Sequence, residues 1–227
     1  KFCMKQTSSY IGVSETLVNW VQKNKLHQNA YVLPNIIRKR SDFKKNSNCG
    51  NIIVIGNFRP QKNYEFLCEL ISQLPNSIKV DLYGNPTDQN YYNKIVALAN
   101  KLNISSRLNI IPGITNVIER AHNYQMGLHC APSETGPLVA IEYLSIGLPF
   151  IMYQTGEVSK VIKKHQVASI MTDFNNDQWK KSIMNILNNQ NLRERIANQN
   201  LQLFETYYSE KTYIEKCLKI YDDIQNF

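Results

Sequence analysis

From residue 51 onward, short β-branched runs alternate with amphipathic stretches. This alternation is typical of βαβ units, in which crossover helices join parallel strands. It predicts an α/β fold, namely a Rossmann-like doubly wound parallel sheet with extra helices at the C-terminal end. The predicted strands span 51–55, 78–83, 108–111, 126–130, 149–153 and 167–171. The predicted helices span about 63–73, 89–102, 117–123, 137–146, 177–189, 191–207 and 211–225.

The first fifty residues follow a different pattern. Residues 10–13 are predicted to form a strand, Ser14 opens a helix that runs to about residue 24, and 31–33 form a second strand. Residues 35–50 are polar and basic and are predicted to form a linker. A strand, a helix and a strand are too few elements to bury a core of their own. This leading segment must therefore pack on the main domain, on another chain or on a domain outside this sequence.

The net charge of +8 is concentrated in the leading segment. Residues 1–50 carry nine basic and two acidic side chains, whereas the remaining 177 residues carry seventeen and sixteen. The densest basic patch consists of Arg38–Arg40 with Lys44 and Lys45. A nucleic-acid interface would interleave aromatic residues with the basic ones, and this patch has none. We expect either a solvated linker or peripheral contact with an acidic membrane surface, and no nucleic-acid partner.

Hydrophobic residues make up 43% of the chain, which excludes a disordered polypeptide, and the apolar runs are too short to cross a bilayer. The five cysteines are an odd number, widely spaced and without a Cys-x-x-Cys pair. This usage favours reduced thiols in the cytoplasm, with peripheral contact at the inner face of the membrane through the basic patch. No metal-ligand spacing links cysteines and histidines, so we expect no metal site. Structural roles are expected for His27, His122, His129 and His165.

Ligands of doubly wound sheets bind where the strands end, so the loops that follow the strands are the candidate sites. After the strand at 51–55, Gly56 begins a turn that contains Arg59 and Lys62 and leads into a helix. Two cations at a helix N-terminus oppose the helix dipole unless an anion binds there. With the helix amides they would hold a phosphate or diphosphate, and the alternative is two solvated basic residues on a surface loop. On the same edge of the sheet, Thr155 and Gly156 offer a hydroxyl and an amide.

Two carboxylates follow the predicted strand at 126–130. Gly136 is predicted as the N-cap and Pro137 as the first residue of the next helix, whose free amides would face the strand ends. Glu134 lies just before this start, and Glu142 lies about a turn and a half inside the helix, among apolar residues. Ligand hydroxyls can donate hydrogen bonds to such carboxylates. The alternatives are a partly exposed Glu142 beside a basic residue and a Glu134 that only complements the helix dipole.

Taken together, these loops resemble the glycosyltransferases of the GT-B fold, and within them the large retaining family 4. The resemblance is carried by Arg-Pro-Gln-Lys-Asn after the strand and glycine, by Leu-Tyr-Gly at 82–84, by Ile-Ile-Pro-Gly at 110–113, and by the run from Pro132 to Pro149. In that run, Glu134 and Glu142 are separated by seven residues, the family's E-x7-E arrangement, between a Pro-Ser and a Gly-x-Pro. Many members have an arginine where this chain has Asn57.

The resemblance implies a role for each matching residue. Arg59 and Lys62 would bind the diphosphate of the donor and neutralise the leaving group, with no metal or other cofactor. Glu142 would accept from the ribose hydroxyls, and Glu134 would orient the donor sugar through its hydroxyls. Amides at the helix start would assist at the phosphates, and the backbone at 111–114 would meet the base. The donor-binding residues implied in this way are Gly56, Ile111, Gly113, Gly136, Pro137, Leu138 and Glu142.

The resemblance also implies a division of the chain. Residues 1–34 would be the end of an acceptor-side N-terminal domain, 35–50 a basic linker, and 51–227 the nucleotide-sugar donor-binding domain with its C-terminal helices. The expected reaction transfers a hexose from a nucleoside diphosphate sugar to a glycan or glycolipid, with retention, in polysaccharide or lipopolysaccharide biosynthesis. The alternative is a non-catalytic module of the same fold that binds a nucleotide sugar or docks on a membrane or partner.

Overall fold

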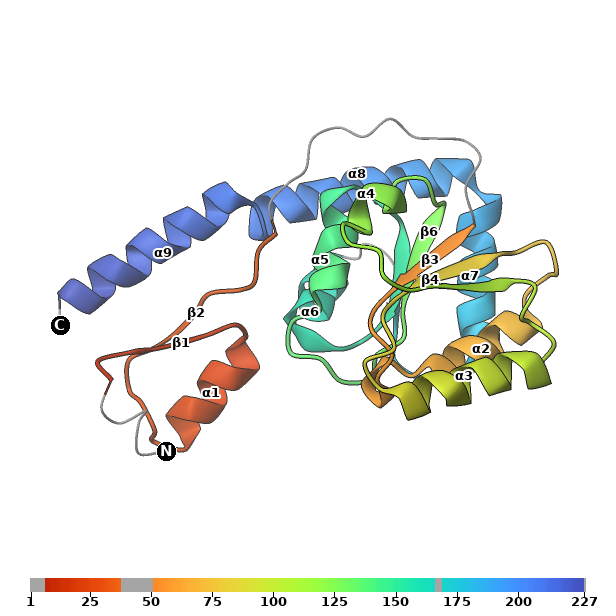
Figure 1. Cartoon of the computed structure of the whole chain (residues 1–227). Helices are drawn as coiled ribbons and strands as arrows, with labels where there is room; N and C mark the ends of the chain where they lie inside the picture. Colours follow the sequence, from red (N-terminus) through yellow and green to blue (C-terminus); the bar gives the residue numbers. More distant parts are fainter. Residues whose placement is uncertain (1–6, 38–50, 166–168, 227) are drawn as a thin grey trace.

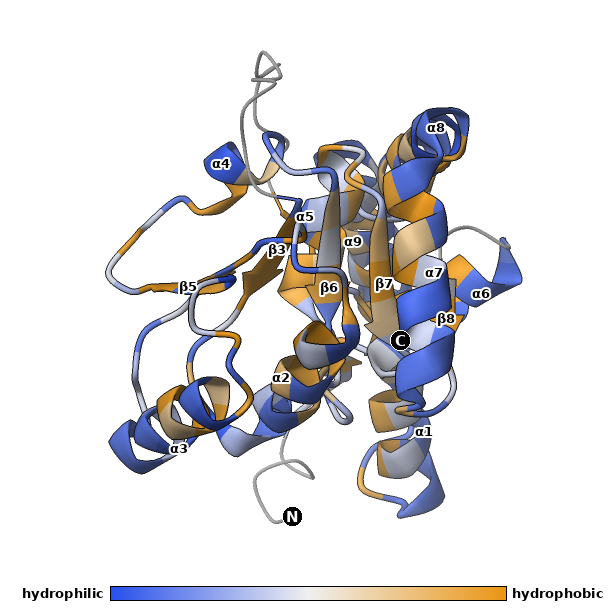
Figure 2. Ribbon diagram, turned by 90° about the vertical axis from the view of Figure 1, so that its right-hand side faces the viewer, coloured by the Kyte–Doolittle hydropathy of each residue, from blue (hydrophilic) through white to orange (hydrophobic). Residues whose placement is uncertain are grey.

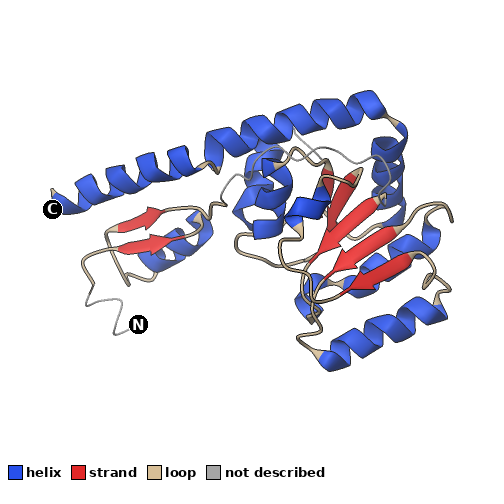
Figure 3. Ribbon diagram, turned by 45° about the horizontal axis from the view of Figure 1, so that its top comes forward, coloured by secondary structure: helices blue, strands red, loops and turns tan. Residues whose placement is uncertain are grey.

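The computed structural model describes residues 7–37, 51–165 and 169–226, and its centre is a six-stranded parallel sheet (Figures 1 and 3). The strands are β3 (Ile52–Ile55), β4 (Val80–Tyr83), β5 (Leu108–Ile111), β6 (Met126–His129), β7 (Phe150–Tyr153) and β8 (Ser169–Met171). Their order is β5-β4-β3-β6-β7-β8, and every neighbouring pair is parallel. The predicted α/β doubly wound fold is confirmed. The direction of strand addition reverses between β3 and β6, which is the switch point of such a sheet.

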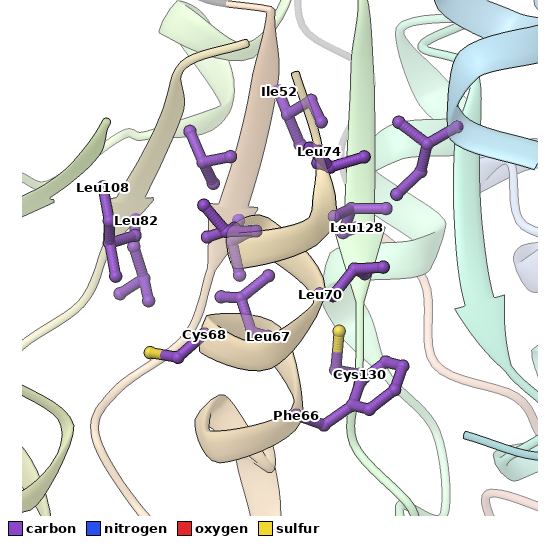
Figure 4. Packing of buried hydrophobic residues seen from close by; sticks show 14 of the residues in the cluster. Ile52, Phe66, Leu67, Cys68, Leu70, Leu74, Leu82, Leu108, Leu128 and Cys130 are labelled. Carbon is purple, nitrogen blue, oxygen red and sulfur yellow. The ribbon is translucent and has the colours of Figure 1, made fainter. Parts of the chain in front are cut away.

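Helices cover both faces of this sheet, so its strands are apolar on both sides. Within β3, Ile52 and Val54 contribute to one core and Ile53 to the other, and none of the three is more than 2% exposed. Figure 4 shows the first core, where Leu67 and its neighbours pack on the strands. The helices are α2 (Tyr64–Gln73), α3 (Gln89–Lys101), α4 (Ile118–Ala121), α5 (Leu138–Ser145), α6 (Gly156–Lys164), α7 (Asn176–Asn188) and α8 (Gln190–Tyr207). Those of the first face are α2, α3 and α7, and α4, α5 and α6 cover the second (Figure 2).

Two helix predictions need correction. Helix α5 begins at Leu138, so Gly136 is not its N-cap and Pro137 is not its first residue. The chain is still extended at Pro137, with ψ 101°, and the carbonyl of Pro137 accepts the first helical bond, from the amide of Ala140 at 3.1 Å. The turn at 153–157 is predicted to lead from a strand into a helix, but no bounds were predicted for that helix; α6 begins at Gly156 of this turn and runs for nine residues. Residues 167 and 168 of the last predicted strand lie outside the described residues.

The leading segment forms the predicted strand, helix and strand. They are β1 (Tyr10–Gly12), α1 (Glu15–Lys23) and β2 (Ala30–Val32), and β1 pairs with β2 in parallel. Ser14 is the N-cap of α1, and its hydroxyl accepts from the amide of Leu17 at 3.3 Å. The last helix, α9 (Glu210–Gln225), extends from α8 alongside this unit (Figure 1). The basic patch at 38–40, 44 and 45 lies outside the described residues.

Contacts between the leading unit and the sheet domain lie near the ends of the strands. The Lys160 Nζ on α6 donates to the Thr16 Oγ1 on α1 at 3.1 Å, and the Asn35 Nδ2 donates to the carbonyl of Gly136 at 3.3 Å. These bonds place α1 opposite α6, beside the loop that leads into α5. Within the described part of the chain, no helix has both the length and the apolar content needed to span a membrane.

We expect Gly84→Ala to lower the free energy of unfolding by about 2–3 kcal/mol, because overpacking against an immobile backbone costs this order of energy. A Cβ at Gly84 would lie 1.9 Å from the carbonyl oxygen of Gly56, at the end of the neighbouring strand. The matched control is Gly113→Ala, which has open space around its Cβ but a positive φ of 76°, and should cost about 1 kcal/mol. Urea unfolding of both variants measures the difference, and equal losses would contradict the close approach of these two loops.

Candidate functional site

The loops that follow β3 and β6 lie on the two sides of the switch point, and each contributes a charged side chain. The Nζ of Lys62 donates a hydrogen bond to the Oε1 of Glu134, which closes an ion pair between residues 72 positions apart. Both side chains are 20% exposed, so the pair is partly shielded from solvent. Two residues proposed from sequence for donor binding are thus in direct contact.

The turn after β3 directs Lys62 toward Glu134. A short 3-10 helix (Pro60–Lys62) is followed by Asn63 in the left-handed region, at φ 54°, and α2 starts at the next residue. Gly56 leaves room for the lysine stem, since a Cβ at Gly56 would lie 3.0 Å from the Cε of Lys62. The first amide of α2, on Tyr64, donates to the hydroxyl of Tyr91 at 2.8 Å. Lys62 therefore faces the switch point from a helix start that is already capped by a tyrosine.

The backbone of Glu134 is held by the loop after β7. The amide of Glu134 donates to the Oγ1 of Thr155 at 2.7 Å, and that hydroxyl donates back to the carbonyl of Glu134 at 3.3 Å. Thr155 is buried, and Gly156 follows it at φ +67°. A Cβ at Gly156 would lie 2.9 Å from the carbonyl oxygens of both Glu134 and Thr135. Glycine is therefore required where α6 begins against the glutamate loop.

The electrostatic environment keeps Glu134 ionised. Burial by itself raises the pKa of this carboxyl, but the close approach of His129 and the ammonium of Lys62 outweigh it and lower the pKa to about 2. The Nε2 of His129 lies 3.5 Å from the Oε2 of Glu134, and the histidine side chain is only 3% exposed. The sequence prediction gave His129 a structural role, whereas the structure places it at the candidate site. The sequence does contain an indication of this position, because His129 is a polar residue at the end of an apolar strand.

The loops on the β5 side of the switch point are tied to one another. The amide of Gly113 donates to the Oδ1 of Asn85 at 2.7 Å, and the amide of Asn85 donates to the Oδ1 of Asn57 at 3.0 Å. These bonds connect the ends of β3, β4 and β5, and Ile111 is the last residue of β5. The sequence prediction had assigned no such role to Asn57 or Asn85.

Arg59 is not brought to the Lys62–Glu134 pair. It is exposed, and its Nε donates to the Oγ1 of Thr87, on the loop after β4, at 3.3 Å. Glu142 is half-buried in the second turn of α5, as the sequence predicts. At the start of that helix, the amides of Leu138 and Val139 form no hydrogen bond with another described residue. Helix α5 therefore begins, four residues after Glu134, with two amides that no other described residue binds.

A cavity of about 760 Å³ adjoins Glu134 on the side of the leading unit. Its walls include Leu17 and Trp20 of α1, Gln154 after β7, and Lys160 of α6. Trp20 is 49% exposed, which is unusual for an indole in a packed unit. Among the described residues, no three histidine, cysteine or acidic side chains are grouped as a metal ion would require. Within the described residues, the site therefore combines the Lys62–Glu134 ion pair, helix amides without a described partner, and a cavity with an aromatic wall.

We expect the stability of the protein to fall as pH drops from about 4.5 toward 2, because the pKa of Glu134 is lowered to about 2 in the folded state. The ion pair stabilises the fold fully above the unfolded-state pKa and is lost as the folded carboxylate is protonated. Glu134→Gln should flatten this decline by about 1–2 kcal/mol, after allowance for solvent screening. Urea unfolding at pH 2.5, 4 and 6 measures the free energy of unfolding of both proteins. The control is Glu69→Gln, because Glu69 is exposed. An unchanged pH profile in Glu134→Gln would contradict the assignment.

Residues 35–202 match the family model described as glycosyl transferases group 1. An uncharacterized glycosyltransferase of Haemophilus influenzae is 24% identical over 184 residues, which are 78% of this chain and 50% of that protein. The chain thus spans half the length of this curated relative.

Solved structures share the fold at low sequence identity. Sucrose-phosphate synthase from Thermosynechococcus elongatus superimposes with a TM-score of 0.84 at 14% identity, over 98% of this chain and 60% of that one. Anabaena HepE in complex with UDP-glucose gives 0.81 at 14% identity, over 97% and 64%. A Staphylococcus aureus TarM mutant in complex with Fondaparinux, alpha-GlcNAc-glycerol and UDP gives 0.81 at 16%, over 96% and 45%. These superpositions confirm the Rossmann-like domain of the GT-B fold, and since the family model spans most of the sheet domain and its switch-point loops, the chain belongs to the glycosyl transferases group 1 family.

Proposed function

We propose that this chain is mainly the donor-binding half of a retaining family 4 glycosyltransferase, which transfers a hexose from a nucleoside diphosphate sugar to a glycan or glycolipid. The observation that carries the proposal is the Lys62–Glu134 ion pair at the switch point, in the loop that leads to the first amides of α5, which no other described residue binds. A cation and free helix amides suit a diphosphate, and an ionised carboxylate suits sugar hydroxyls. One ligand with both groups would satisfy the whole site.

In this proposal, Lys62 turns from Glu134 to the diphosphate and neutralises the charge that develops on the leaving group. The amides of Leu138 and Val139 add donors at the positive end of the α5 dipole. Arg59 is exposed, so it can leave Thr87 and add a second cation. Lys62 and Arg59 then place positive charge beside the diphosphate oxygens, where negative charge develops during transfer.

The two carboxylates take different parts of the donor. Glu134, freed from Lys62, accepts from hydroxyls of the sugar, and Glu142 accepts from the ribose. Backbone groups from Ile111 to Gly113 meet the base, on loops that the Asn85 side chain holds together. Likeness of fold to HepE bound to UDP-glucose and to TarM bound to UDP supports this class of donor.

The acceptor is proposed to approach through the cavity between α1 and α6. Its wall contains both Glu134 and Trp20, so a ring that packs on the indole would lie beside the donor sugar. The alpha-GlcNAc-glycerol bound by the TarM mutant supports an acceptor of glycan type. The division into an acceptor-side end at 1–34, a linker at 35–50 and a donor-binding domain at 51–227 belongs to the same proposal.

Isothermal titration with UDP-glucose, GDP-mannose and ADP-glucose tests the donor. We expect one of them to bind, and Lys62→Ala to weaken its affinity by about 10- to 100-fold, since a hydrogen bond to a charged group contributes about 1.5–3 kcal/mol. Arg59→Ala and Glu142→Ala should each weaken binding by a smaller factor. Lys94→Ala is the control, because this lysine pairs with Glu65 on the surface. The proposal is wrong if no donor binds the wild type, or if every variant binds as the wild type does.

Fluorescence quenching tests the cavity. The chain has two tryptophans, of which Trp20 is 49% exposed and Trp179 is fully buried. We expect alpha-GlcNAc-glycerol, added together with the nucleoside diphosphate, to protect Trp20 from acrylamide, because the acceptor ring packs on the indole, while the nucleoside diphosphate alone protects less. In Trp20→Phe the remaining emission should show no protection. Equal protection with and without the glycan would contradict an acceptor position on Trp20.

A further inference from the structure

The side chain of His129 is a buried polar group whose outer nitrogen has no hydrogen bond. Its backbone is paired with Met152 of β7, so the position of His129 within the sheet is fixed by this strand pairing. The residue is 2% exposed, and the Nε2 forms no hydrogen bond with the described residues. Burial of an unpaired ring nitrogen costs free energy, and an apolar side chain would fill the same space without that cost. The ring therefore requires an explanation beyond packing.

The geometry points the ring at the carboxylate of Glu134. The distance from the Nε2 of His129 to the Oε2 of Glu134 is 3.5 Å, slightly longer than a hydrogen bond. An Nε2 without a proton would direct its lone pair at an ionised carboxylate, which is repulsive. The favoured state of the ring therefore carries a proton on the Nε2, and a small movement of Glu134 closes the bond.

Lys62 and His129 contact different oxygens of the same carboxylate. Lys62 donates to the Oε1, whereas His129 faces the Oε2, and among the described side chains these two are the polar partners of this group. If Lys62 turns to a diphosphate, the carboxylate loses its charged partner while it remains partly buried. The orientation of Glu134 then depends on a second hydrogen-bond donor to its carboxylate.

We propose that His129 is a positioning residue, which takes over the Oε2 of Glu134 when Lys62 leaves for the diphosphate and so keeps the Oε1 directed at the donor sugar. This inference rests on the proposed donor-binding function. It assigns His129 an effect on the sugar part of the ligand and none on the nucleotide part, because the ring faces Glu134, the carboxylate proposed to accept from the sugar hydroxyls.

The test compares His129→Leu with His129→Gln by calorimetry. The leucine removes the donor at similar volume, and the glutamine amide restores a donor near the position of the Nε2. We expect His129→Leu to weaken affinity for the nucleotide sugar about tenfold and to leave affinity for the nucleoside diphosphate within about twofold. His129→Gln should recover most of the loss. Leu128→Met, on the same strand but in the opposite core, controls for general disturbance of β6.

Equal loss for both ligands, or no recovery in His129→Gln, would overturn the inference. Nitrogen NMR of the wild-type histidine rings gives a second test that does not depend on a folded leucine variant. We expect a proton on the Nε2 of His129 and a change in its shift when the nucleotide sugar is added. A bare Nε2, or a shift that the ligand leaves unchanged, would contradict the inference. If the wild type binds no nucleotide at all while the Nε2 carries a proton, the proposed donor-binding function is wrong. The positioning role of His129, which rests on that function, is then wrong as well.

Discussion

The ion pair between Lys62 and Glu134 depends on the order of the strands. In a sheet with the order β5-β4-β3-β6-β7-β8, the loops after β3 and β6 diverge to opposite faces and leave a crevice between them. The two residues are 72 positions apart in the chain, and only this adjacency brings them together. Partial burial costs each charge some of its hydration free energy, and the attraction between the two charges offsets this cost. In the proposed function, a diphosphate and a sugar offer each of them a replacement partner.

The loops around this crevice are held by hydrogen bonds between side chains and backbone groups. These bonds do not use the charged groups of Lys62 and Glu134. Asn57 and Asn85 connect the loops on one side, and Thr155 holds both the amide and the carbonyl of Glu134 on the other. Close approach of the chain at Gly84 and Gly156 removes the space in which these loops would relax. The site is therefore organised before any ligand arrives, which lowers the entropic cost of binding.

The sequence predicted the strands to within one or two residues, because their apolar runs depend on local patterning that the sheet confirms. It also predicted that Lys62 and Glu134 belong to one site, since parallel strands end at the same edge. It did not predict the later start of α5, because the extended backbone at Pro137 packs closely against Gly156, which is nineteen residues further along the chain. The contact of Arg59 with Thr87 and that of His129 with Glu134 were missed for a related reason. Side chains that meet across strands leave no periodic signal.

The leading unit reaches the same loop from the other direction. Asn35 donates to the carbonyl of Gly136, two residues beyond Glu134, and Thr16 accepts from Lys160 on the helix that follows Thr155. The loop that orients Glu134 is thus bonded on one side to the sheet domain and on the other to the segment that carries Trp20. The cavity wall and the loop of Glu134 are therefore linked by hydrogen bonds that involve neighbouring parts of the chain.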